Sequence, residues 1–218
     1  MMGASNFGHY YLWLGLFLLG CYHGVNPGMG WLFAVALGLQ DRSTAAVLRA
    51  IVPLALGHFV SVAVVVTIAV AAVAAFPHAL VRDVAASILL AFGAYRLIRA
   101  RHPRWVGVRV GFWGLALWGF LMSAAHGAGL MLLPFVTAAS SVAHRMAMPM
   151  PAAPAHETVA TGALMVIVHT AGYLAAMTAV ALVVYRWVGV SFLRRAWVNV
   201  DVIWGVALIL SGIVAFMT

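Results

Sequence analysis

Four histidines placed in apolar sequence are the residues of this chain best suited to chemistry. His23, His58, His126 and His169 each lie within a long apolar run, where an ionisable side chain is costly and usually faces a bundle interior or a water-filled path. Neutral imidazole is a common ligand of transition metals, and it also exchanges protons near neutral pH. The four histidines therefore predict a shared site for a metal ion or for protons. The alternative is that each one only hydrogen-bonds a neighbouring helix.

The first histidine belongs to the stretch HGVNPGMG, which should interrupt a helix. Pro27 removes a backbone donor and clashes with the preceding turn, and Asn26 is pushed out of the helical region by the proline after it. We expect two half-helices that meet near residues 24–28. The freed backbone carbonyls and the Asn26 side chain would then supply oxygen ligands, as in transporters built on discontinuous helices.

Sulfur atoms accompany the histidines and would favour a soft metal. Met29 follows the predicted break, and soft thioether ligands select Cu(I), although methionine in an apolar helix is more often packing filler. Residues 140–158, which include the run MAMPMP, are expected to form an irregular linker. This linker either recruits a soft metal through its methionines and histidines or is only a connector.

The composition places these residues in a membrane protein. The chain of 218 residues is 66% hydrophobic and only 7% charged, whereas soluble domains are about 25% charged. Its net charge of +8 is best explained by basic loops that contact lipid headgroups, so nucleic acid is not an expected partner.

Six apolar segments are long enough to be membrane spans, and arginine sets their orientation. They cover roughly residues 10–40, 50–75, 82–98, 111–138, 158–186 and 197–217. Ten of the 12 basic residues lie in alternate loops, which by the positive-inside rule face the cytoplasm; they are Arg42, Arg49, Arg96, Arg99, Arg101, Arg104, Arg109, Arg186, Arg194 and Arg195. We therefore expect a multi-pass protein of a bacterial-type inner membrane with both termini on the non-cytoplasmic side.

The two halves of the chain carry matching features in the same order. His23 pairs with His126, each followed by glycine; His58 pairs with His169; and the Asp-Val at 83–84 pairs with that at 201–202. Because three spans per half is an odd number, the halves would have opposite orientations, as in many secondary transporters. The predicted fold is all-α, with six transmembrane segments in a 3+3 inverted repeat whose first helix is broken in each repeat. The repeats would occupy residues 1–100 and 111–218, joined by a basic cytoplasmic linker at 101–110.

The motif in the first span resembles that of the nickel/cobalt exporter family, within the LysE-type superfamily of 3+3 inverted-repeat transporters. That family motif runs approximately His-Ala-x-(Asp/Asn)-Pro-(Asp/Gly)-His-Gly, and His23, Asn26, Pro27, Gly28 and Gly30 fit it. The resemblance implies a metal-site role for His23 and Asn26. Met29 stands where the family has a second histidine, which would soften the site, and the family's histidine-rich cytoplasmic loop is missing.

These observations predict a secondary transporter of a transition-metal cation, not an enzyme. The expected ligands or proton carriers are His23, Asn26, Met29, His58, His126 and His169, and the ion would be Ni, Co, Cu or Zn. No ATP-binding loop is present, so energy would come from an ion gradient or from a partner transport subunit. A homo-oligomer is also open. The alternatives are a proton-coupled transporter of a small organic solute, a b-type haem subunit with axial histidines, and a membrane-embedded metalloenzyme.

Overall fold

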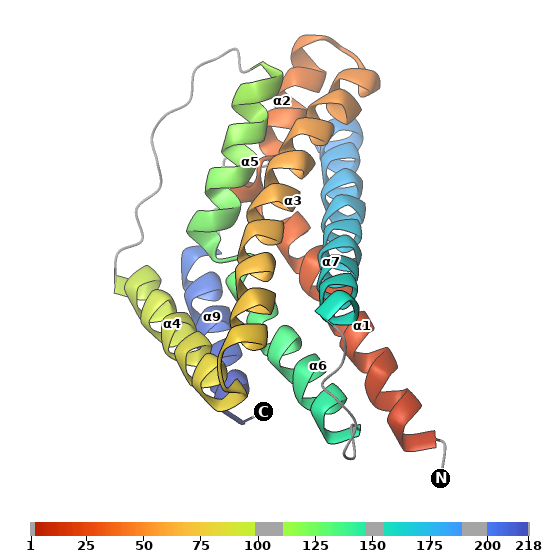
Figure 1. Ribbon diagram of the computed structural model, residues 1–218. Coiled ribbons are helices and arrows are strands. Elements are labelled where there is room, and N and C mark those ends of the chain that lie inside the picture. Colours follow the sequence, from red (N-terminus) through yellow and green to blue (C-terminus); the bar gives the residue numbers. More distant parts are fainter. Residues whose placement is uncertain (1–2, 99–110, 147–154, 189–199, 218) are drawn as a thin grey trace. The chain divides into compact units, whose positions relative to one another are not determined.

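The computed structural model describes residues 3–98, 111–146, 155–188 and 200–217, and every element in these ranges is helical (Figure 1). The elements in chain order are α1 (Gly3–Val25), η1 (Pro27–Met29), α2 (Trp31–Gln40), α3 (Thr44–Ala75), α4 (His78–Ile98), α5 (Phe112–His126), η2 (Leu130–Leu132), α6 (Leu133–Met146), α7 (Ala155–Val183), the π-helical turn η3 (Val184–Val188) and α9 (Val200–Met217). The predicted all-α class is therefore confirmed for the described residues.

Several of these helices are suited to a membrane. Thr44–Ala75, His78–Tyr95 and Val159–Trp187 are each long and apolar enough to cross one. Phe112–His126 and Leu130–Ala139 form a pair bent by 54°, which adds a fourth span if the pair is counted as one. Large apolar side chains such as Ile68, which is 64% exposed, point outward, as expected where lipid replaces water as the solvent.

The first apolar run breaks at the proline and glycines. α1 ends at Val25, Asn26 is extended with φ −65° and ψ 123°, and Pro27 begins the short 3-10 turn η1. Gly30 then takes φ 108°, a left-handed conformation that glycine adopts without steric cost, and α2 starts at the next residue. The half-helices expected from the sequence are thus present.

A second break separates α5 from α6, and glycine rather than proline makes it. Gly127 has φ 70° directly after the last residue of α5. Pro134 is the second residue of α6, a position in the first turn where its missing donor costs nothing. Each half of the chain therefore contains a broken helix followed by a long helix.

Two predicted boundaries change in the structure. The described ends of the linker expected at 140–158 are helical, because α6 continues to Met146 and α7 begins at Ala155. The remaining residues 147–154, including Met148 and Met150, lie outside the described residues, as does the basic linker predicted at 101–110.

The chain forms two compact units, and each takes segments from both halves of the sequence. The first consists of Met1–Ser61, Arg104–Ala125 and Ile167–Val198. The second consists of Val62–Pro103, His126–Val166 and Asn199–Thr218. Neither unit coincides with one of the predicted repeats, because α3 and α7 each contribute residues to both units.

Close helix crossings at small residues hold the first unit together. A Cβ atom on Gly20 of α1 would overlap the carbonyl oxygen of His169 in α7, and one on Gly172 of α7 would overlap that of Phe17. Gly57 of α3 and Gly119 of α5 are equally close to the backbone of the facing helix. Such backbone contact is typical of helix pairs in membranes, where small residues allow the main chains to approach.

In the second unit α4 and α9 lie side by side (Figure 1). Glycine again sets the distance, because a Cβ atom on Gly93 would stand 3.0 Å from the carbonyl oxygen of Gly205. The ring of His78, at the start of α4, donates from Nε2 to the carbonyl oxygen of Thr137 in α6 at 2.8 Å.

Candidate functional site: a buried histidine triad

Three of the four predicted histidines lie together in the first unit. His23 is near the end of α1, His58 is within α3 and His169 is within α7, and all three side chains are fully buried. Their ring centroids are 5.0 Å apart for His23 and His169, 5.4 Å for His58 and His169, and 6.0 Å for His23 and His58. We call these residues the histidine triad.

The glycine crossing between α1 and α7 makes this cluster possible. Gly20 lies one turn before His23, and its backbone contacts the carbonyl group of His169. Helices this close bring side chains one turn away into contact, because residues three or four apart share a helix face. The glycine at the crossing thus allows the rings of His23 and His169 to contact each other.

The hydrogen bonds of His23 and His169 define their tautomers. Nδ1 of His23 is 2.8 Å from the carbonyl oxygen of Leu19, and Nδ1 of His169 is 3.4 Å from that of Leu16. A carbonyl oxygen can only accept, so Nδ1 carries the proton in each neutral ring. The lone pair therefore resides on Nε2, which is buried in both residues.

His58 reaches the same tautomer through a side chain. Its Nδ1 is 2.8 Å from Oγ of Ser123, and that hydroxyl donates to Sδ of Met29 at 4.0 Å. Because the hydroxyl proton is directed at sulfur, the oxygen accepts from Nδ1–H of His58. Nε2 of His58 and Nε2 of His169 have no hydrogen-bond partner in the described part of the chain.

Tyr173 closes one side of the triad. Its ring stacks on that of His58, with centroids 3.9 Å apart and planes 5° from parallel. Its hydroxyl donates to the carbonyl oxygen of Met29 at 3.2 Å, so the residue links α7 to the turn after the helix break. Tyr173 is fully buried, and its ring fixes the plane in which the His58 imidazole lies.

Asn26 has a local structural role in this structure. Its side-chain oxygen accepts from the backbone N–H of Gly28 at 2.8 Å and so caps the 3-10 turn. Asparagine commonly caps a helical turn in this way. Its Nδ2 is buried without a hydrogen-bond partner among the described residues.

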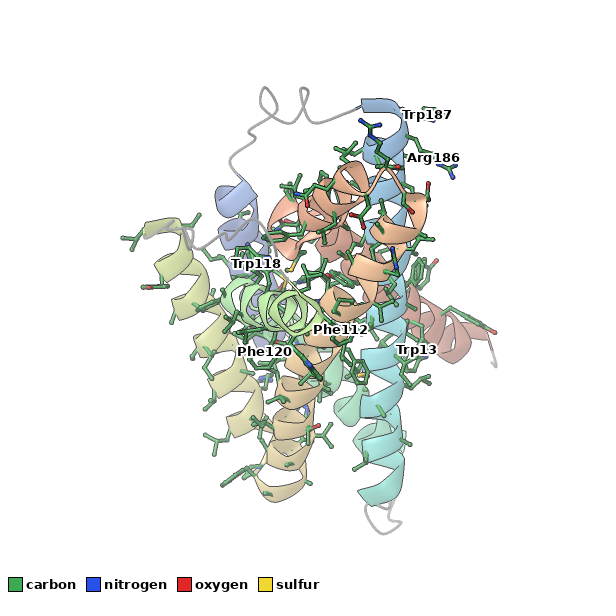
Figure 2. The ribbon with its side chains drawn as sticks, turned by 90° about the horizontal axis from the view of Figure 1, so that it is seen from above. Trp13, Phe112, Trp118, Phe120, Arg186 and Trp187 are labelled. Atoms are coloured by element: carbon green, nitrogen blue, oxygen red, sulfur yellow. The ribbon has the colours of Figure 1, made fainter. Side chains whose placement is uncertain are left out.

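The carbonyls that the break was expected to free are largely taken up by side chains. The acceptors are Val25, bonded by Nε1 of Trp31 at 3.0 Å; Gly28, bonded by Nε1 of Trp118 at 3.2 Å; and Met29, bonded by Tyr173. Trp118 is labelled in Figure 2, on α5. Buried backbone groups need partners of this kind. Each of these three carbonyl oxygens accepts one hydrogen bond and keeps a second lone pair, so the expected oxygen ligands at the break stay a prediction.

His126, the fourth predicted histidine, belongs to the second unit. It is the last residue of α5 and is 1% exposed. The triad is therefore made of the three predicted site histidines that lie in the first unit, His23, His58 and His169. Met29 is buried in that same unit with its sulfur directed at Ser123.

Metal-ligand geometry is not preformed in the described ranges. No group of three or more histidine, cysteine, aspartate or glutamate side chains there is arranged to hold a metal ion. The triad has the right spacing between rings, since imidazoles that share one ion at about 2.0–2.1 Å have centroids roughly 5 Å apart. The Nε2 atoms would have to turn toward a common point.

Ser123, Tyr173 and Trp118 were not predicted from the sequence. A signal existed for the tyrosine, because Tyr173 comes four residues after His169 and so shares its helix face. Ser123 is a polar residue three positions before His126 in an apolar run, but its partner His58 is 65 residues away. Only the fold brings these two together.

No protein-family model matches the chain, and no curated protein or solved structure matches it either. The resemblance to nickel/cobalt exporters therefore stays a prediction from the sequence.

Proposed function

We propose that this protein is a secondary transporter of a transition-metal cation and that the histidine triad is its central site. The observation that carries the proposal is that His23, His58 and His169 each make a hydrogen bond through Nδ1. Each Nδ1 donates to a protein group, and each buried Nε2 therefore holds a lone pair. Metal-ligating histidines usually have this arrangement, in which the second nitrogen is held by a hydrogen bond.

The donor set indicates the class of ion. Imidazole nitrogen suits Ni, Co, Cu and Zn, whereas Mg²⁺ and Ca²⁺ take oxygen ligands. The triad itself supplies imidazole nitrogens, and its hydrogen bonds and ring contacts described above are with a hydroxyl, a phenol ring and carbonyl groups. A site of neutral nitrogens leaves the charge of the ion uncompensated, which would favour release of the ion.

The transport architecture we propose is a six-span inverted repeat with both termini outside the cytoplasm. Its support is the order of elements, which runs broken helix, long helix, further helix in each half. The helix crossings also correspond, because α1 packs on α7 and α5 packs on α3, each through glycine. Rocking of one repeat against the other would give alternating access in the membrane of a bacterial-type cell.

A proton-coupled transporter of a small organic solute is the second candidate. The observation in its favour is that the triad, as described, is not arranged for chelation. The haem alternative is disfavoured, since Gly20 of α1 lies against the backbone of His169 and leaves no slot for a macrocycle between these helices.

Metal titration of the purified protein tests the proposal. We expect binding of Zn²⁺, Co²⁺, Ni²⁺ or Cu⁺ at one site, and loss of that binding in His23→Ala and His169→Ala. His78→Ala is the matched control, because this histidine contacts Thr137 in the second unit. Uptake of the bound ion into vesicles should fail in the same two variants. Wild-type protein that binds none of the four ions would leave the solute transporter as the better explanation.

A further inference from the structure

The three histidines of the triad differ in what holds Nδ1. His23 and His169 donate to backbone carbonyls, which can only accept, so their tautomers are fixed by the main chain. His58 contacts the hydroxyl of Ser123 at 2.8 Å instead. A hydroxyl can both donate and accept, so the tautomer of His58 depends on where the Ser123 proton points.

Met29 decides the direction of that proton. Its sulfur is 4.0 Å from Oγ of Ser123, and a thioether can only accept. The side chains of Ser123 and Met29 are both fully buried, which leaves the pair shielded from solvent. With its proton directed at sulfur, the Ser123 oxygen offers a lone pair to Nδ1–H of His58.

We propose that Ser123 is a positioning residue which, oriented by Met29, holds His58 in the Nδ1–H tautomer and so presents the Nε2 lone pair to the triad. The inference rests on the proposed function only for the identity of the cargo. It gives Met29 a role that acts through Ser123 instead of direct ligation. The stacked Tyr173 ring fixes the plane of His58, and Ser123 fixes which nitrogen is the ligand.

The tautomer can be read directly by ¹⁵N NMR of histidine-labelled protein in detergent. The His58 signals are assigned by their loss in His58→Gln. In the wild type we expect a protonated Nδ1 and an unprotonated Nε2. In Ser123→Ala, Nδ1 loses its acceptor, and the signals should shift toward the Nε2–H form. Met29→Leu keeps the volume, removes the sulfur acceptor, and should shift the signals in the same direction by less.

Ser61→Ala is the matched control, because Ser61 is a buried serine on α3 one turn from His58. It should leave the His58 signals unchanged. Zn²⁺ affinity should fall about 10–100-fold in Ser123→Ala, the usual loss when a residue that orients a ligating histidine is removed, and should be retained in Ser61→Ala.

The NMR measurement of the His58 tautomer tests the inference, and the measurement of Zn²⁺ affinity tests its link to the proposed function. A His58 tautomer unchanged in Ser123→Ala would overturn the inference, whatever the metal result. A shifted tautomer with unchanged Zn²⁺ affinity would overturn the link between tautomer and cargo. If the wild type binds no metal but the tautomer shifts, Ser123 still positions His58 and the metal transporter is wrong.

Discussion

Tyr173 joins the histidine site to the broken helix through two different parts of its side chain. The ring stacks on His58 at a centroid distance of 3.9 Å, and the hydroxyl donates to the carbonyl oxygen of Met29 at 3.2 Å. These two contacts can be separated by substitution, since phenylalanine keeps the ring and removes the donor. At the scale of a residue, the pair of contacts therefore yields a quantitative test.

Tyr173→Phe should destabilise the protein slightly and leave the triad intact. The carbonyl of Met29 loses its interhelical donor, and hydrogen bonds between membrane helices average about 0.6 kcal/mol, with a maximum of about 1.7 kcal/mol. Equilibrium unfolding in mixed detergent micelles measures this difference. Tyr173→Leu also removes the stacked ring, so its loss should be larger; equal losses in the two variants would show that the stack contributes nothing.

Residue types could be predicted from the sequence, but their partners could not. The apolar surroundings of His23, His58 and His169 mark them as candidates, because buried ionisable groups are costly. The capping role of Asn26 was not predicted, although its oxygen can bond the N–H of Gly28 only two residues away, and such local bonds compete with distant ones. The contact of His58 with Ser123 joins two helices, so no local pattern encodes it.

At the scale of the helix, glycines determine how closely α1 and α7 approach. Gly20 and Gly172 each face the backbone of the other helix, and neither has room for a Cβ atom. The ring centroids of His23 and His169 are 5.0 Å apart. Moving the two helices apart would separate these two rings. The crossing is therefore a structural requirement of the triad.

Gly20→Ala should weaken both folding and the site. The new methyl group overlaps the carbonyl oxygen of His169, and overpacking of this kind typically costs about 1–3 kcal/mol. Gly111→Ala is the control, because nothing lies within 4 Å of a Cβ atom at that position. Unfolding midpoints and Zn²⁺ titration of both variants check the prediction. A Gly20→Ala protein with wild-type stability would mean that α1 and α7 do not cross this closely.

Helix breaks were easier to predict than helix ends. Pro27 and its neighbouring glycines exclude a continuous helix by backbone sterics alone, and the break appears there. α6 extends further than the predicted span, because the alanines and serines near residue 140 do not terminate a helix and carry no capping signal. The composition of residues 140–158 suggested an irregular linker, but no residue at the start of this segment ends the helix, so α6 continues to Met146.

For the whole molecule, the distribution of charge predicts the membrane topology, which the helix positions alone do not give. Arginine is concentrated in alternate loops, and ten of the 12 basic residues fall there. Short loops that carry basic residues stay in the cytoplasm when the protein is inserted into the membrane. The arrangement predicts that the segment 101–110 is cytoplasmic and that both ends of the chain are not.

Paired reporter fusions test this topology. Alkaline phosphatase folds only outside the cytoplasm and green fluorescent protein fluoresces only when it folds inside. We expect phosphatase activity without fluorescence after residue 218, and fluorescence without phosphatase activity within residues 101–110. Replacing Arg99, Arg101, Arg104 and Arg109 by glutamine removes much of the orienting charge and should give a mixture of both orientations.

The side on which each end of the chain lies also tests the number of spans. If both ends lie on one side of the membrane, the number of spans is even, and with three spans in each half the two halves must be inverted. A C-terminus in the cytoplasm with an N-terminus outside it would make the total odd, and the 3+3 inverted repeat would then be wrong.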